Sequence, residues 1–172
     1  LMKKTVLFLL LCTVWVLQSK SQVKKIKHVV LIGIDGFGAY AVPDADMPVL
    51  KQLMSTGSWS LKARSVLPSS SAVNWASMLM GAGPTLHGYT EWDSKTPEIP
   101  SAATNEYGVF PGIFGLLKQQ QTQYKSAVIY NWGGIGYLFE KKAVDIVVHD
   151  EEAGGDFLQT RQRLLLKKKS RI

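Results

Sequence analysis

The chain has 172 residues, 46% of them apolar, so it can enclose one sizeable core but not two full domains. Its formal charge is +7, yet nine of the 20 basic residues lie before residue 22 or from Arg161 onward, and residues 22–160 hold 11 basic against 13 acidic side chains. No basic stripe with interleaved aromatic residues is present, which argues against nucleic acid as a partner.

The N-terminal residues have the order of charge and hydropathy that is typical of a signal peptide. Lys3 and Lys4 precede an apolar run from Val6 to Leu17, and a polar stretch follows that ends at Ser21. The run has about twelve residues, well short of the roughly 20 that a helix needs to cross a bilayer. We therefore predict that residues 1–21 are a signal peptide. The rest of the chain is then periplasmic or secreted, without a stable membrane span.

Strand-like and helix-like segments alternate along the remaining chain. The apolar, β-branched run Val29–Ile34 lies between charged residues and a glycine-rich loop, which predicts a buried, central parallel strand. Residues 90–108 are predicted to form a polar loop. Helices are predicted over Met47–Met54, Ala72–Met80, Phe110–Gln120 and Asp156–Lys169, and further strands over Ser58–Leu67, Ala127–Tyr130 and Ala143–Val148. This order predicts an α/β layered sheet.

The end of the first predicted strand is the first candidate binding position. In open α/β sheets, ligands bind at the carboxyl ends of the strands, and Asp35 is the first residue past this strand. Its carboxylate can bind a divalent metal ion, and Gly36 and Gly38 allow the backbone to come close. Alternatively, Asp35 is a turn or helix-capping residue.

A second candidate lies in the segment LPSSSAVNWASM, where a strand is predicted to end at Leu67 and a helix to begin near Ala72. Ser71 would stand at the helix N-terminus, where free amides and the helix dipole favour an anion such as phosphate. A metal ion bound to the same hydroxyl would lower its pKa and make it a nucleophile. Alternatively, the serines at positions 69–71 only cap the helix.

Taken together, the two segments resemble a known family. Asp35, a hydroxyl residue 36 positions later, Asn74 and the run MGAGPTLHG are similar to the nucleotide pyrophosphatase/phosphodiesterase branch of the alkaline phosphatase superfamily. The similarity covers residues 28–93, with looser agreement to about residue 150. It implies that residues 22–172 are the N-terminal portion of an α/β, alkaline-phosphatase-like layered sandwich with a mostly parallel central sheet, whose C-terminal part is missing.

The resemblance also implies roles for individual residues. Asp35 matches the family's first metal-binding aspartate, and Ser71 matches the nucleophile that also binds a metal ion. Asn74 and His87 match positions that support the nucleophile helix and the turn after it, and Asn74 is also a candidate substrate contact. The implied protein is a metal-dependent hydrolase of small phosphate esters (phosphodiesterase, nucleotide pyrophosphatase or phosphatase) with two divalent metal ions, Zn²⁺ by expectation.

Several residues depart from the family's pattern. Ala72 and Val73 stand where Phe-Pro is common after the nucleophile, and residues 89–93 contain no asparagine where one is expected to bind the oxyanion. The substrate subtype is therefore open. A sulfatase is disfavoured, because no pattern for formylglycine formation surrounds Ser71.

The family's remaining metal ligands, in patterns such as Asp-x-x-x-Gly-His and Asp-His, are not found. The histidines are His28, His87 and His149, and no Asp-His pair occurs. The sequence thus predicts an incomplete metal site and a truncated chain with little activity of its own. The alternative function is a non-catalytic, exported anion-binding α/β module.

Two other segments could also bind ligands. The glycine-rich segment 130–140 is predicted to be a loop, and the charged segment 149–152 is predicted to be a solvated turn.

Overall fold

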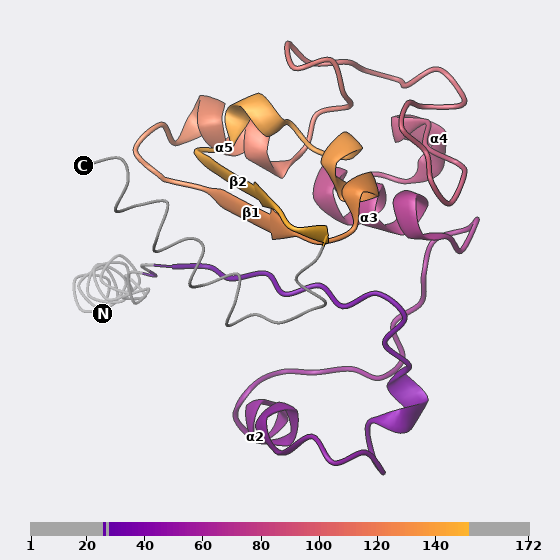
Figure 1. Ribbon diagram of the computed structural model, residues 1–172, viewed down its shortest axis with the longest axis vertical. Coiled ribbons are helices and arrows are strands. Elements are labelled where there is room, and N and C mark those ends of the chain that lie inside the picture. Colours follow the sequence, from indigo (N-terminus) through magenta and orange to yellow (C-terminus); the bar gives the residue numbers. More distant parts are fainter. Residues whose placement is uncertain (1–25, 27, 152–172) are drawn as a thin grey trace, which may run out of the picture. The chain divides into compact units, whose positions relative to one another are not determined.

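The computed structural model describes residue 26 and residues 28–151 of the chain (Figure 1). This part is an α/β structure with a small sheet of two parallel strands and short helices. It divides into two compact units, the first ending at Phe37 and the second beginning at Gly38. The predicted signal peptide and the helix predicted over Asp156–Lys169 lie outside the described residues.

The sheet consists of β1 (Ala127–Tyr130) and β2 (Ile146–His149), which run parallel and are paired along their full length. The sequence predicted both strands, but β2 begins later than expected. The connection between them contains two turns of 3₁₀ helix, η2 (Gly133–Tyr137) and η3 (Lys141–Ala143), and η3 takes up the start of the predicted strand. Parallel strands commonly use an α-helix for this crossover.

The first two long helices confirm the predicted ones, with small shifts at their ends. α2 (Pro48–Thr56) begins at a proline, whose fixed φ suits the first helical position, and Gly57 follows it with an extended φ of −111° rather than the left-handed φ of many C-terminal glycines. α3 (Ser71–Met80) ends at Gly81, which has a left-handed φ of 62°. Glycine adopts that φ without steric cost, so the helix ends where the sequence predicts.

The remaining helical segments are shorter. α5 (Ile113–Gln120) begins later than predicted, after the Gly112 N-cap. α4 (Pro84–His87) is a short helix within the segment that the sequence analysis treated only as a turn, and it begins at a proline. A 3₁₀ turn, η1, covers Ala39–Ala41. The polar loop predicted over residues 90–108 contains neither helix nor strand.

The hydrophobic core of the second unit forms mainly from α3, η2 and the segment between η2 and β2. α3 buries one face, because its apolar residues recur at a helical spacing. The Phe139 ring makes edge contacts with Phe114 and Tyr130, at centroid distances of 5.5 and 5.9 Å. The buried cluster consists of Ala72, Ala76, Leu79, Met80, Tyr89, Ile135, Leu138, Phe139 and Val144.

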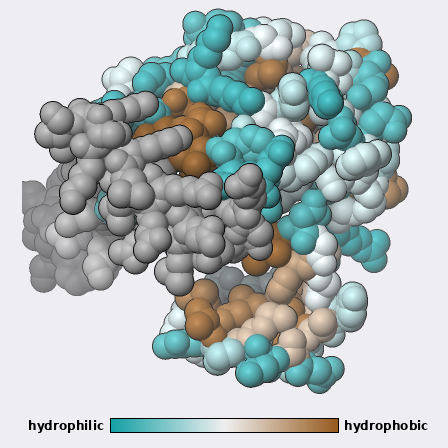
Figure 2. Space-filling model, viewed as in Figure 1, coloured by the Kyte–Doolittle hydropathy of each residue, from teal (hydrophilic) through white to brown (hydrophobic). Residues whose placement is uncertain are grey.

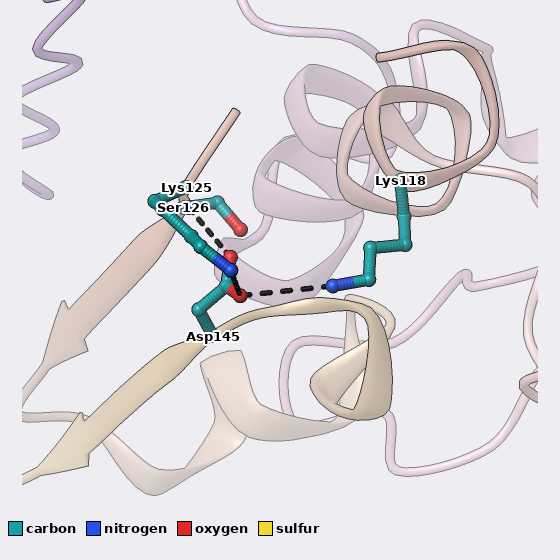
Figure 3. A network of polar contacts seen from close by, with 4 residues as sticks. All are labelled: Lys118, Lys125, Ser126 and Asp145. Atoms are coloured by element: carbon teal, nitrogen blue, oxygen red, sulfur yellow. Dashed lines mark hydrogen bonds and ion pairs between the residues drawn. The ribbon is translucent and has the colours of Figure 1, made fainter. Parts of the chain in front are cut away.

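An exposed polar network joins the start of the sheet to α5 (Figure 3). Asp145 accepts hydrogen bonds from the Ser126 amide and the Lys125 ammonium, each at 3.0 Å, and its Oδ1 atom lies 3.6 Å from the Lys118 Nζ atom. The Ser126 amide, and after it the two lysines, lower the pKa of Asp145 from 3.8 to about 2. The carboxylate therefore stays charged well into the acid range.

Two predicted strands are not formed in the described structure, and both predictions were wrong here. Residues 29–34 have no strand partner among the described residues, and Val29 and Ile34 are 86% and 65% exposed. Residues 58–67 are irregular, and the Val66 amide donates to a side chain, the Asn74 Oδ1 atom, instead of a neighbouring strand. A local apolar pattern forms a strand only where a second strand takes its backbone hydrogen bonds. The layered sandwich therefore stays a prediction.

Some apolar surface is exposed in the second unit. Figure 2 shows apolar residues on the surface of the segment that contains α2, where Val49 and Leu53 are 69% and 62% exposed. α2 itself contains no fully buried residue. Among the described residues, no helix has both the length and the apolar character that crossing a bilayer requires.

Candidate functional site

Ser71 is the first residue of α3, and the Asn74 side chain holds the segment before it. The Asn74 Oδ1 atom accepts a hydrogen bond from the Val66 amide, and its Nδ2 atom donates to the Ser70 carbonyl, each at 2.9 Å. Asn74 therefore fixes the chain that leads into the serine. This matches the supporting role predicted for Asn74, whereas a contact with substrate stays a prediction.

The start of α3 offers backbone donors to an anion. The N-cap residue Ser70 makes no side-chain capping bond, and the Ala72 amide donates to the Trp92 carbonyl at 3.1 Å. Within the described part of the chain, the amides of Ser71 and Val73 have no acceptor. Unpaired first-turn amides and the helix dipole together favour a negatively charged group at this position.

The three consecutive serines before and at the helix start differ in their contacts. The Ser69 hydroxyl accepts a hydrogen bond from the Ser65 hydroxyl at 2.9 Å, and the Ser70 Oγ atom is buried with no described partner. The partly buried Ser71 hydroxyl makes no hydrogen bond to any described group. Ser71 is the only one of the three that is part of the helix, so its hydroxyl lies in the first turn.

His87, at the end of α4, is fully buried and connects that turn to α3. Its Nδ1 atom accepts a hydrogen bond from the Tyr89 amide at 3.1 Å, so the ring proton lies on Nε2, which contacts the Ser77 hydroxyl at 2.9 Å. The Ser77 hydroxyl in turn donates to the Val73 carbonyl. Burial lowers the pKa of His87 below 6.5 and favours this neutral ring. His87 is thus a structural hydrogen-bonding residue that supports α3, as predicted, and both of its ring nitrogens are occupied.

Asp35 forms a local turn in the first unit. Its Oδ1 atom accepts a hydrogen bond from the Gly36 amide at 2.8 Å, and Gly36 has a left-handed φ of 67°. Glycine at this position permits the chain to turn directly after the carboxylate. Asp35 belongs to the first unit and Ser71 to the second, so their meeting at one metal ion stays a prediction.

The described residues do not by themselves form a metal centre. Within residues 26 and 28–151, no three side chains of His, Cys, Asp or Glu lie close enough together to hold a metal ion. His149, at the end of β2, stacks on the Tyr130 ring with a centroid distance of 4.8 Å, and its Nε2 atom lies 3.3 Å from Glu151. Glu151 therefore contacts the last residue of β2, and the described residues of this charged segment do not form a cation site.

The part of the sequence that contains all of these residues matches one family. Residues 29–163 match the type I phosphodiesterase / nucleotide pyrophosphatase family. The chain belongs to this family. The match confirms the resemblance inferred from Asp35, Ser71 and the segment after α3. Searches of curated proteins and of solved structures gave no match.

One buried residue of this phosphodiesterase-family chain was missed in the sequence. Glu140 is 1% exposed, and its Oε1 atom accepts hydrogen bonds from the Gly112 amide at 2.5 Å and from Asn105 Nδ2 at 3.0 Å. Its Oε2 atom is buried with no partner among the described groups. A Cβ atom at Gly112 or Gly115 would lie 2.8 or 2.7 Å from the carboxylate oxygens. Glu140 therefore joins the N-terminus of α5 to the loop before it.

Proposed function

We propose that this chain is part of a hydrolase of small phosphate esters, with Ser71 as the nucleophile. One observation supports this: Ser71, which the resemblance assigns as the nucleophile, is the first residue of a ten-residue helix, beside amides that have no described acceptor. Phosphodiesters, nucleotide pyrophosphates and phosphomonoesters all present the phosphoryl oxygens that such donors bind.

The proposed chemistry has two steps. The Ser71 Oγ atom attacks phosphorus and forms a P–O bond, the bond to the leaving alcohol or phosphate breaks, and the hydroxyl proton passes through water to the leaving oxygen. A water molecule then attacks the phosphoserine, which releases phosphate or its monoester and restores the hydroxyl. The Ser71 and Val73 amides would hold the phosphoryl oxygens during both attacks, while Asn74 keeps the serine in place.

The family is generally metal-dependent. We propose that the active protein binds two divalent ions, which we expect to be Zn²⁺, with Asp35 and Ser71 among their ligands. Such ions supply positive charge to the phosphoryl group. The described residues do not complete a site for them, so the remaining ligands have to come from outside this part of the chain. Because the sequence contains neither Asp-x-x-x-Gly-His nor Asp-His, we expect this chain to turn over substrate poorly.

We also propose that the protein acts outside the cytoplasm. The support is the order of charged, apolar and polar residues over positions 1–21, which export machinery recognises and a signal peptidase removes. Mass spectrometry of the exported protein should find an N-terminus near Gln22.

The nucleophile can be tested without efficient turnover. The full chain would be incubated with bis(4-nitrophenyl) phosphate and Zn²⁺, and phosphorylated peptides would be sought by mass spectrometry. Ser71→Ala removes the proposed nucleophile, and Ser69→Ala is the matched control, because Ser69 lies in the same segment but outside the helix. We expect modification of Ser71 in the parent chain and in Ser69→Ala, and none in Ser71→Ala.

The outcomes separate the enzyme from a binding module. Phosphate binding without any modification of Ser71 would favour the non-catalytic, exported anion-binding module. Robust turnover that Ser71→Ala abolishes would support the nucleophile but contradict the expected low activity.

The proposed metal ligand is tested by equilibrium dialysis against Zn²⁺. Uptake should be weaker for Asp35→Asn than for Asp44→Asn, which removes the same charge at a residue with no proposed role.

A further inference from the structure

A cleft of about 230 Å³ lies in the second unit, between the loop before α5 and the connection from β1 to β2. The loop contributes Lys95 and Tyr107, and the connection contributes Tyr137, Lys141 and Lys142, while the aromatic ring of Phe139 also lines the cleft. Its lining thus combines three ammonium groups with aromatic surface. No residue predicted for the hydrolase site belongs to it.

These lysines form no ion pairs with described carboxylates, although desolvation, and after it the nearby Glu106 and Glu140, raise the pKa of Tyr107. Lys118 and Lys125 both pair with Asp145, whereas Lys95, Lys141 and Lys142 make no ion pair with any described residue. None of the described lining residues is acidic. The Glu140 carboxylate, next to Lys141 in sequence, is buried and faces Gly112 and Asn105 instead. Three unpaired cations at one cleft create a local positive potential that attracts a multivalent anion.

Lys141 is held in a defined position. Its Nζ atom lies 5.4 Å from the centre of the Tyr137 ring, in the range of a cation–π contact. Gly136 makes room for this ammonium group, because a Cβ atom there would lie only 2.7 Å from Nζ. The lysine therefore loses less side-chain entropy when it binds an anion than a freely rotating one would.

Hydrogen bonds join the two walls of the cleft. The Tyr89 hydroxyl, at the start of the loop, donates to the Tyr137 carbonyl at 3.0 Å. Asn105 donates to Glu140 at 3.0 Å and accepts a bond from the Tyr107 amide, also at 3.0 Å. These hydrogen bonds hold the two walls together, so the cleft is already formed without a ligand. Small-molecule sites are commonly pre-formed in this way.

We propose that this cleft binds a small, multivalent phosphate-type anion, such as pyrophosphate or a compact phosphomonoester. Lysines act as point charges toward phosphate groups, and three of them match a ligand that carries two or more negative charges. A volume of about 230 Å³ suits a small ligand, since drug-sized molecules occupy roughly 300–1,000 Å³. The Tyr107 and Phe139 rings would contact the apolar part of an ester. The inference does not depend on Ser71 being a nucleophile.

Calorimetric titration with pyrophosphate tests the proposal, with Ser71→Ala as the parent so that no covalent step at the hydrolase site adds to the heat. Lys141→Gln/Lys142→Gln removes two of the three charges, and Lys62→Gln/Arg64→Gln is the control of equal charge change at exposed positions outside the cleft. We expect saturable binding that weakens at least about tenfold in the first variant and less than about twofold in the control. Acetate, with a single charge, should bind far more weakly.

A second measurement needs no variant. Pyrophosphate should protect Lys95, Lys141 and Lys142 from an amine-acetylating reagent while Lys62 reacts as before, read by mass spectrometry of the peptides. Equal weakening in both charge variants would show non-specific attraction and overturn the proposal. Absence of saturable binding, equal affinity for acetate and pyrophosphate, or absence of protection at the three lysines would overturn it as well.

Discussion

The Nε2 atom of His87 lies 2.9 Å from the Ser77 hydroxyl, and this contact connects the end of α4 to the middle of the helix that begins at Ser71. The Ser77 hydroxyl donates onward to the Val73 carbonyl, in the first turn of the same helix. A neutral histidine, buried and hydrogen-bonded at both ring nitrogens, thus stabilises the element that carries the proposed nucleophile. Its protonation state should therefore affect the stability of the fold.

We expect the free energy of unfolding to fall as the pH falls below about 6.5. Burial lowers the pKa of His87 in the folded protein, so below the ordinary value of 6.5 the unfolded chain takes up a proton that the folded chain does not. Urea denaturation between pH 5 and 8 measures this slope. His87→Gln should flatten it while His28 and His149 stay in place, and should cost about 1–3 kcal/mol at pH 8. An unchanged slope in His87→Gln would contradict the assignment.

Glu140 should contribute more to stability than its position before two exposed lysines suggests. Glu140→Ala would leave the Gly112 amide and Asn105 without their acceptor inside the structure, and we expect a loss of about 2–4 kcal/mol. Glu140→Gln keeps one acceptor oxygen and should lose less. Glu106→Ala, at an exposed glutamate nearby, is the control and should change stability by no more than about 0.5 kcal/mol. Equal losses for the alanine and glutamine variants would exclude the hydrogen bonds as the cause.

The effect of Gly115→Ala should reverse when Glu140 is removed. Alanine is favoured over glycine within a helix by about 1 kcal/mol, yet a Cβ atom at position 115 would lie 2.7 Å from the Glu140 Oε1 atom. We expect Gly115→Ala to destabilise the parent chain and to stabilise the Glu140→Ala variant. A double-mutant cycle of chemical denaturation measures the coupling. Additive effects would show that the two side chains do not compete for space.

Parts of the site were predicted from sequence because local rules determine them. The apolar spacing after Ala72 and the glycine at position 81 define α3, and a serine before such a spacing marks its start. Glu140 was missed because its burial depends on a contact with Gly112, which lies 28 residues away in the sequence. The residues next to Glu140 in the sequence do not indicate this contact. The lysines of the cleft were missed for the same reason, since Lys95 and Lys141 meet only in the folded chain.

The wrong strand prediction for Val29–Ile34 shows that a local pattern alone does not determine whether a strand forms. Its apolar, β-branched residues satisfy the local pattern of a buried strand, but pairing depends on a neighbour that a local pattern does not provide. β1 and β2 were correctly predicted by the same rule because each finds the other as a partner. The rule therefore identifies segments that can form strands, while tertiary pairing decides which of them do.

Asn74 should determine how firmly the approach to Ser71 is held. Asn74→Ala removes the acceptor of the Val66 amide and the donor to the Ser70 carbonyl, and we expect a loss of about 1–2 kcal/mol in stability. Hydrogen exchange at the Val66 amide should accelerate in Asn74→Ala, whereas Asn74→Asp, which keeps an acceptor oxygen, should retain most of the protection. Unchanged exchange at Val66 in both variants would remove the positioning role and leave substrate contact as the reason for this residue.

Asp145 should contribute to stability only above the acid range. Its pKa is about 2 in the folded protein against 3.8 normally, so its contribution is complete above about pH 4 and is lost as the pH falls toward 2. Asp145→Asn should therefore weaken the acid dependence of unfolding between pH 4 and 2, followed by circular dichroism. The Ser126 amide is the largest cause of the shift, ahead of the lysines shown in Figure 3. Lys125→Gln should consequently retain most of the acid dependence; if it removed as much as Asp145→Asn, the ion pair rather than the amide would be the dominant contact.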